Sequence, residues 1–139
     1  MLAPKALDPE EALVCTMVLV AAADGGLTDR EIGAMAGLVQ TLPVFRDFSS
    51  ERLKVATDAA VSLLGEADGL AHAARLISEA LEPRLRETAY ALACDVIAVD
   101  HQARQTELDM LEFVREKLTI DPLIARALER GARARSQHP

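Results

Sequence analysis

Four acidic residues recur as two matching pairs in this 139-residue chain. Asp24 and Asp100 each end an apolar stretch, and Glu31 and Glu107 each follow after a six-residue spacer. Carboxylates that are brought together repel one another unless protons, cations or basic side chains compensate them. Ligand sets made only of oxygen suit hard cations such as calcium or magnesium. We therefore take Asp24, Glu31, Asp100 and Glu107 as candidate ligands of a divalent cation, without assigning the metal.

The first pair also has a purely local explanation. Thr28 and Glu31 have the spacing of a capping box at a helix start, and Asp24 precedes Gly25 as in a helix C-terminal turn. In the second copy Arg104 replaces Thr28 and His101 replaces Gly25, so we expect that capping and turn chemistry to be absent there. Retention of both carboxylates without their local partners favours a shared site, and a scaffolding role remains the alternative.

The pairs belong to a longer internal repeat with a shift of 76 residues. Residues 20–24 fall on residues 96–100, and four further apolar positions coincide: Ile32, Met35, Leu38 and Leu42 fall on Leu108, Leu111, Val114 and Leu118. We expect two related halves, about residues 9–64 and 68–135, to pack about a pseudo-two-fold axis within one domain, 1–139. That packing would bring the matching acids to one face.

The elements that must position these acids are helices. Pro follows an acidic residue at Asp8, Glu82 and Asp121, which is typical of a helix start. Capping residues indicate three further starts, at Thr28, at Ser49 or Ser50, and at Asp68, and a further helix is expected from about Arg104. The predicted helices run from about Pro9 to Ala23, Thr28 to Leu42, Ser49 or Ser50 to Leu64, Asp68 to Leu81, Pro83 to Val99, Arg104 to Leu118, and Pro122 to Arg135.

The composition favours the same fold class. Half of the residues are hydrophobic but only 3% are aromatic, and there is no Trp, so the core must consist mainly of small and unbranched side chains. Residues 12–23 and 89–99 are apolar on nearly every face, as expected of helices at the centre of a bundle. We predict an all-α, single-domain bundle of about seven helices around these two. Tyr90 should be buried in the second of them, with Asp95 or a backbone carbonyl as its partner.

Charge and cysteine use limit the possible partners. The formal charge of −7 repels phosphate backbones, so we expect no nucleic-acid partner. The exception is the C-terminal helix, where four arginines face one acid, Glu129; it is either a cationic helix end or an anion-binding adaptor surface. Cys15 and Cys94 should be buried, inert thiols, which fits the reducing cytoplasm. Residues 12–23 are too few to cross a bilayer, so we expect no membrane span.

Several other chemistries lack their residues. An EF-hand needs oxygen ligands where this chain has Val20 and Ala22, and no His-Glu-x-x-His, Glu-x-x-His or Cys-x-x-Cys sequence occurs. A hydrolase that uses Asp24 or Glu31 as general base is the enzymatic alternative. It would also need a nucleophile or a substrate clamp, and the sequence offers neither. We therefore expect a binding module and not an enzyme.

The segments Val20–Ile32 and Arg86–Asp100 resemble the two halves of the TerB (tellurite resistance) family, and the resemblance covers nearly the whole chain. It implies an all-helical fold with an internal duplication, and a role in tellurite or other stress resistance. It also implies a divalent cation held by the four acids, and an integral membrane protein partner at the inner face of the membrane. The departures are His101, where the second motif usually has Gly, and Arg104 nearby. The oligomeric state is not implied.

Overall fold

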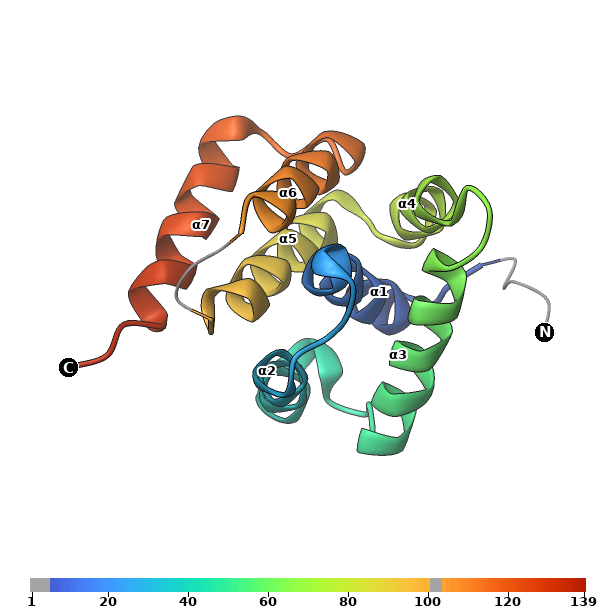
Figure 1. The fold of residues 1–139 in the computed structure, drawn as a ribbon, viewed down its shortest axis with the longest axis horizontal. Helices are drawn as coiled ribbons and strands as arrows, with labels where there is room; N and C mark the ends of the chain where they lie inside the picture. Colours follow the sequence, from blue (N-terminus) through green and yellow to red (C-terminus); the bar gives the residue numbers. More distant parts are fainter. Residues whose placement is uncertain (1–5, 101–103) are drawn as a thin grey trace.

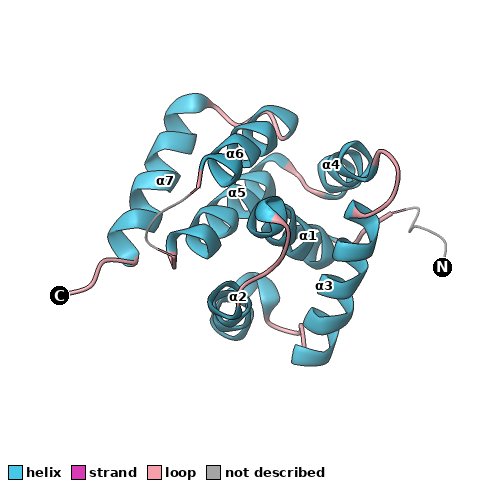
Figure 2. Cartoon of the chain, viewed as in Figure 1, coloured by secondary structure: helices cyan, strands magenta, loops and turns pink. Residues whose placement is uncertain are grey.

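Seven α-helices make up most of the described part of the chain, and no strand occurs there (Figure 2). A computed structural model describes residues 6–100 and 104–139. In chain order the helices and two short 3₁₀ turns are α1 (Pro9–Ala21), η1 (Ala22–Asp24), α2 (Asp29–Thr41), η2 (Pro43–Phe45), α3 (Ser50–Leu64), α4 (Gly69–Ala80), α5 (Pro83–Ala98), α6 (Gln105–Lys117) and α7 (Pro122–Arg135). The predicted all-α fold class is confirmed.

The helix starts follow the predicted local chemistry. Pro occupies the first position of α1, α5 and α7, where its missing N–H costs nothing. Before α1 the carboxylate of Asp8 accepts from the N–H of Glu11 at 2.8 Å, and the Glu11 carboxylate accepts from the N–H of Asp8 at 2.9 Å. Ser49, not Ser50, caps α3 by accepting from the N–H of Arg52.

One predicted cap is wrong. Asp68 precedes α4, but its φ of 56° is left-handed and its side chain makes no capping hydrogen bond. The cause is the tight turn from α3 into α4. A Cβ atom on Gly69 would lie 2.2 Å from the carbonyl oxygen of Leu63, so the backbone passes there at a distance that only glycine permits.

The two helices predicted to be central are central. In Figure 1, α1 and α5 lie side by side with the other helices around them. Helix α1 contacts α3, α4, α5 and α6, and every residue from Ala12 to Ala21 is buried. Helix α5 contacts α1, α2, α6 and α7. A helix covered on all sides has no polar face to present, which is why its sequence shows no amphipathic pattern.

In each predicted half, the helix that follows the central helix crosses to the central helix of the other half: α2 contacts α5, and α6 contacts α1. The bounds of α2, residues 29 and 41, correspond under the 76-residue shift to those of α6, residues 105 and 117. Both helices therefore begin at equivalent sequence positions beside the central pair. The pseudo-two-fold duplication and its half boundaries stay predictions.

The C-terminal helix is joined to α5 by polar contacts. Tyr90 is buried as predicted, but its hydroxyl donates to Glu129 of α7 at 2.6 Å and to neither predicted partner, Asp95 or a backbone carbonyl. Asp95 instead accepts from the guanidinium of Arg135, at 2.7 Å, because α7 runs along α5 and places its last turn there. Arg135 of the basic C-terminal segment thus has a structural partner on α5.

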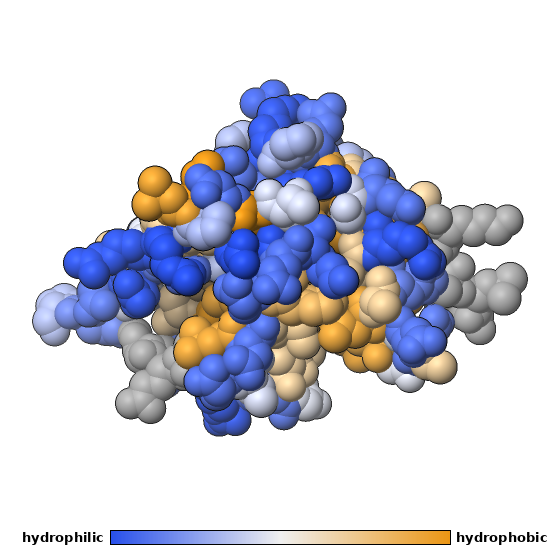
Figure 3. All heavy atoms as spheres, turned by 90° about the horizontal axis from the view of Figure 1, so that it is seen from above, coloured by the Kyte–Doolittle hydropathy of each residue, from blue (hydrophilic) through white to orange (hydrophobic). Residues whose placement is uncertain are grey.

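Surface and core separate as the composition predicts. Figure 3 shows a face that is mainly hydrophilic, with apolar patches between the polar side chains.

Both cysteines are buried, and burial raises the pKa of each thiol to about 12, so they stay protonated and unreactive at neutral pH. Within residues 6–100 and 104–139, no helix has the length and apolar character to cross a membrane.

Candidate functional site

All four predicted acids line one cleft. Its volume is about 550 Å³. Its wall is formed by the end of α1, η1, α2, α6 and the segments that precede α2 and α6: Ala21, Asp24, Gly26, Thr28, Glu31, Asp100, Arg104 and Glu107. The structure thus brings the two sequence-distant pairs together. We call this space the acidic cleft.

The start of α2 fixes Glu31. It is the third residue of the helix, and its carboxylate accepts from the N–H of Thr28 at 2.8 Å. The Thr28 hydroxyl in turn accepts from the N–H of Glu31 at 3.1 Å, which completes the predicted capping box. Glu31 is only 1% exposed. Gly25, with φ of 113°, turns the chain from η1 toward this helix in a conformation that favours glycine.

The start of α6 fixes Glu107 in the equivalent way. It is the third residue of α6, it is 4% exposed, and its carboxylate accepts from the N–H of Arg104 at 3.1 Å. The expectation that capping chemistry is absent from the second copy is therefore half wrong. Arg104 cannot accept a hydrogen bond as Thr28 does, but a backbone N–H serves a carboxylate whatever its side chain is. The predicted loss of the turn at His101 falls outside the described residues.

The two buried glutamates influence each other directly. Burial raises the pKa of Glu107 above its usual value near 4.5. A hydrogen bond with the carboxyl group of Glu31 and the negative charges of Glu31 and Asp24 raise it further, while the N–H of Arg104 acts in the opposite direction. Two ionised carboxylates are both acceptors, so such a contact needs a proton or a cation between them.

Arg104 has a role that the sequence analysis missed. Its guanidinium lies 3.6 Å from a carboxylate oxygen of Asp24 in the other half of the chain. It is the one basic residue among the described residues that line the acidic cleft. The Arg104 side chain is 76% exposed, so solvent screens this ion pair and it compensates the buried glutamates weakly. No sequence motif links residues 24 and 104, so the sequence carried no signal for this ion pair.

The four acids have the chemistry of a hard-cation site, but in this structure they do not have its geometry. Carboxylate oxygens from four residues suit calcium or magnesium. Within the part of the chain that the structure describes, however, no three acidic, histidine or cysteine side chains are arranged to hold a metal ion. A bound cation would therefore draw Asp24 or Asp100, which lie at the same cleft, toward the buried pair.

Comparison with known proteins adds one finding. No curated protein and no solved structure matches the chain significantly. A protein family described as "Tellurite resistance protein TerB" matches residues 10–130, which span α1 to α6 and most of α7. Because this match covers most of the sequence and includes both acidic pairs, the chain belongs to the TerB family.

Proposed function

We propose that this TerB-family chain is a non-enzymatic binding module whose acidic cleft takes up a divalent cation. One observation carries the proposal. The carboxyl groups of Glu31 and Glu107 share a buried position, and no basic side chain among the described residues pairs with either. Buried carboxylates without a compensating charge are costly, so they either retain a proton or acquire a cation.

Backbone hydrogen bonds hold Glu31 and Glu107 in positions where a cation could replace their proton. Each glutamate accepts one N–H at its helix start, which fixes the carboxylate in place. Each also lies near the positive end of a helix dipole, which favours its ionised form. Asp24 and Asp100, which line the same cleft, would complete an all-oxygen ligand set. Calcium and magnesium both accept such ligands, and water molecules would fill the remaining positions.

A binding role fits the lining of the cleft better than catalysis does. The Thr28 hydroxyl is the one side-chain hydroxyl among the described lining residues, and it already caps α2. Neither histidine nor cysteine is present among those residues. A hydrolase would need a nucleophile with its base, and Asp24 or Glu31 alone supplies only the base.

Thermal unfolding with and without metal tests the cation. Calcium or magnesium at a hundredfold excess over its Kd should stabilise the native protein by about 2.7 kcal/mol, which raises Tm by several degrees. The double variant Glu31→Gln/Glu107→Gln keeps both carbonyl acceptors for the helix N–H groups but loses both charges. It should fold and show no metal-dependent increase in Tm.

The matched control removes two acids elsewhere. Asp58 on α3 and Glu66 in the following turn are exposed and lie outside the cleft, so Asp58→Asn/Glu66→Gln makes the same change in net charge. It should retain the full increase in Tm. An equal loss in both double variants would mean that the ions only screen the net charge, and the cleft would then not be the site.

The cellular role follows from family membership and is likewise our proposal. We place the protein in the cytoplasm, in tellurite or related stress resistance, beside an integral membrane protein partner at the inner face of the membrane. Two buried, protonated thiols support a reducing compartment. Co-purification with the membrane fraction that depends on a membrane protein, and not on lipid alone, would test the partner.

A further inference from the structure

A second pocket lies between α5, α6 and α7, and it differs in character from the acidic cleft. Its volume is about 290 Å³, at the low end of pockets that bind small molecules. Ile97, Ala98, Leu108 and Leu111 form an apolar wall. Leu108 is 45% exposed although it is a large hydrophobic residue, so an apolar ligand would cover surface that is now in contact with water.

The carboxylates that line this pocket are already paired. Glu129 accepts from the Tyr90 hydroxyl at 2.6 Å and forms an ion pair with Arg126 at 3.1 Å. Glu112 forms an ion pair with Arg115 at 2.6 Å. Neither acid therefore presents an uncompensated negative charge to a ligand.

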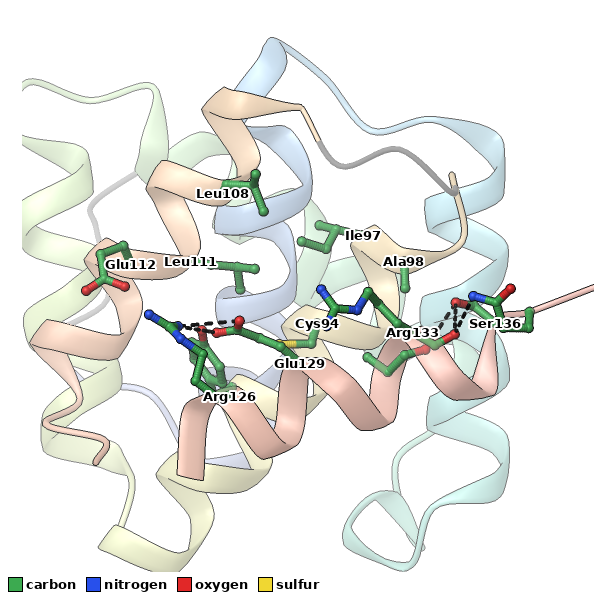
Figure 4. Close-up of a pocket in the computed structure, with 13 residues that line it drawn as sticks. Cys94, Ile97, Ala98, Leu108, Leu111, Glu112, Arg126, Glu129, Arg133 and Ser136 are labelled. Atoms are coloured by element: carbon green, nitrogen blue, oxygen red, sulfur yellow. Dashed lines mark hydrogen bonds and ion pairs between the residues drawn. The ribbon is translucent and has the colours of Figure 1, made fainter. Parts of the chain in front are cut away.

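One cation remains. The guanidinium of Arg133 forms no ion pair with any described residue, whereas Arg126 and Arg135 on the same helix pair with Glu129 and Asp95. Figure 4 shows the Arg133 side chain extending from α7 across the pocket toward Ile97. The pocket thus combines an apolar wall with one positive group at its edge.

We propose that this pocket binds a small organic anion with an apolar chain. The chain would lie against Ile97, Leu108 and Leu111, and the carboxylate would pair with Arg133. This arrangement satisfies the one uncompensated charge and covers the exposed apolar surface, which an amine or a polar anion would not do. The proposal does not depend on cation binding in the acidic cleft, because the two sites share no lining residue.

Methyl NMR of the full chain tests the site with three probes of equal chain length: octanoate, octanol and octylamine. Octanoate should bind saturably and in the millimolar range, as expected for a ligand of this size, and shift the methyl signals of Ile97, Leu108 and Leu111. Octanol should bind at least about fivefold more weakly, because it lacks the charge that pairs with Arg133. Equal affinity for octanoate and octylamine, or shifts centred on the α2–α3 groove at Met35 and Leu53, would overturn the proposal.

A matched pair of variants on α7 tests Arg133. Arg133→Gln should weaken octanoate binding at least about fivefold and leave octanol binding unchanged. Arg130→Gln removes the same charge from an exposed residue outside the pocket, and should change octanoate binding less than about twofold. Both residues are exposed, so both variants should fold, and helical circular dichroism checks this. Equal losses of octanoate affinity in the two variants would mean that only long-range attraction is involved. The proposed pairing with Arg133 would then be refuted.

Discussion

Among single residues, Glu31 and Glu107 are unusual because each has a structural role that does not require its negative charge. Each accepts a backbone N–H at a helix start, and a neutral carboxyl or amide oxygen can do this as well. Each is nevertheless buried beside another acid. A glutamine at either position would keep the hydrogen bond and avoid the repulsion, so helix capping alone does not explain a carboxyl group at both.

The raised pKa of Glu107 makes the stability of the fold depend on pH in metal-free buffer. Because the pKa of folded Glu107 is raised, its contribution to stability is complete below the unfolded value near 4.5 and is lost as the pH rises through the folded pKa. Glu107→Gln removes this titration. At neutral pH the variant should therefore be more stable than the native protein, measured by urea unfolding.

The exposed residue Asp58 provides the comparison for that measurement. Asp58→Asn should leave the decline of stability with pH as it is in the native protein. If Glu107→Gln instead lowered stability at neutral pH in the absence of metal, the ionised form of Glu107 would be the stabilising one. The account of the buried pair would then be wrong.

Tyr90 gives a second prediction at this scale. Burial raises its pKa above the usual 10, and its hydrogen bond to Glu129 adds to the shift. The neutral form therefore stabilises the fold below pH 10, and this contribution is lost at higher pH. Because Tyr90 is the only tyrosine, tyrosinate absorbance should appear together with the loss of helical circular dichroism in an alkaline titration.

The variant Tyr90→Phe isolates the hydroxyl. Glu129 keeps its ion pair with Arg126, so loss of the hydrogen bond should cost about 1 to 2 kcal/mol at neutral pH. The steep alkaline loss of stability should also diminish. Tyrosinate that forms near pH 10 in a fully helical native protein would show that the hydroxyl is accessible and contradict its buried pairing.

At the site, the sequence predicted which residues meet but not how they pair. The shift of 76 residues brought Asp24, Glu31, Asp100 and Glu107 to notice, and all four line one cleft. The ion pair between Arg104 and Asp24 and the contact between Tyr90 and Glu129 were not predictable, because each joins residues far apart in the chain. Such pairs depend on how helices are placed in space, which local patterns do not specify.

For the helices themselves, local signals were sufficient almost everywhere. Capping residues and Pro at first positions indicated six of the seven helix starts, and all seven helices were predicted within two residues at each end. The exception was the turn before α4, where Asp68 looks like a cap in sequence. There the close approach of Gly69 to the Leu63 carbonyl decides the backbone, and this is a tertiary constraint that the identity of a capping residue cannot reveal.

Substitution by alanine should therefore have opposite effects on stability at Gly69 and at Gly33. Gly69→Ala places a Cβ 2.2 Å from a backbone oxygen, so it should destabilise the protein by about 2 kcal/mol or more. Gly33→Ala, inside α2 and with nothing within 4 Å of the added Cβ, should stabilise it by about 0.5 to 1 kcal/mol. Urea unfolding of both variants measures the difference. A neutral Gly69→Ala would show that α3 and α4 can separate at little cost.

For the whole molecule, the position of α1 makes the two predicted halves depend on each other for folding. Helix α1 is buried along nearly its whole length, and three of the four other α-helices that chiefly cover it, α4, α5 and α6, come from the second predicted half. A fragment of residues 1–65 would therefore expose most of α1, and one of residues 66–139 would expose the matching face of α5. Each fragment alone would thus present a large apolar surface to water.

We expect each of these fragments to be largely unfolded alone, and an equimolar mixture to regain the helical circular dichroism of the intact chain. Burial of α1 against α5 supplies the association energy, opposed by the entropy of bringing two chains together and of ordering the unfolded fragments. The acidic cleft draws its acids from both fragments, so any cation-dependent stabilisation should appear only in the mixture. A fragment that unfolds cooperatively by itself would contradict this, because it would make the chain two independent units and not one domain.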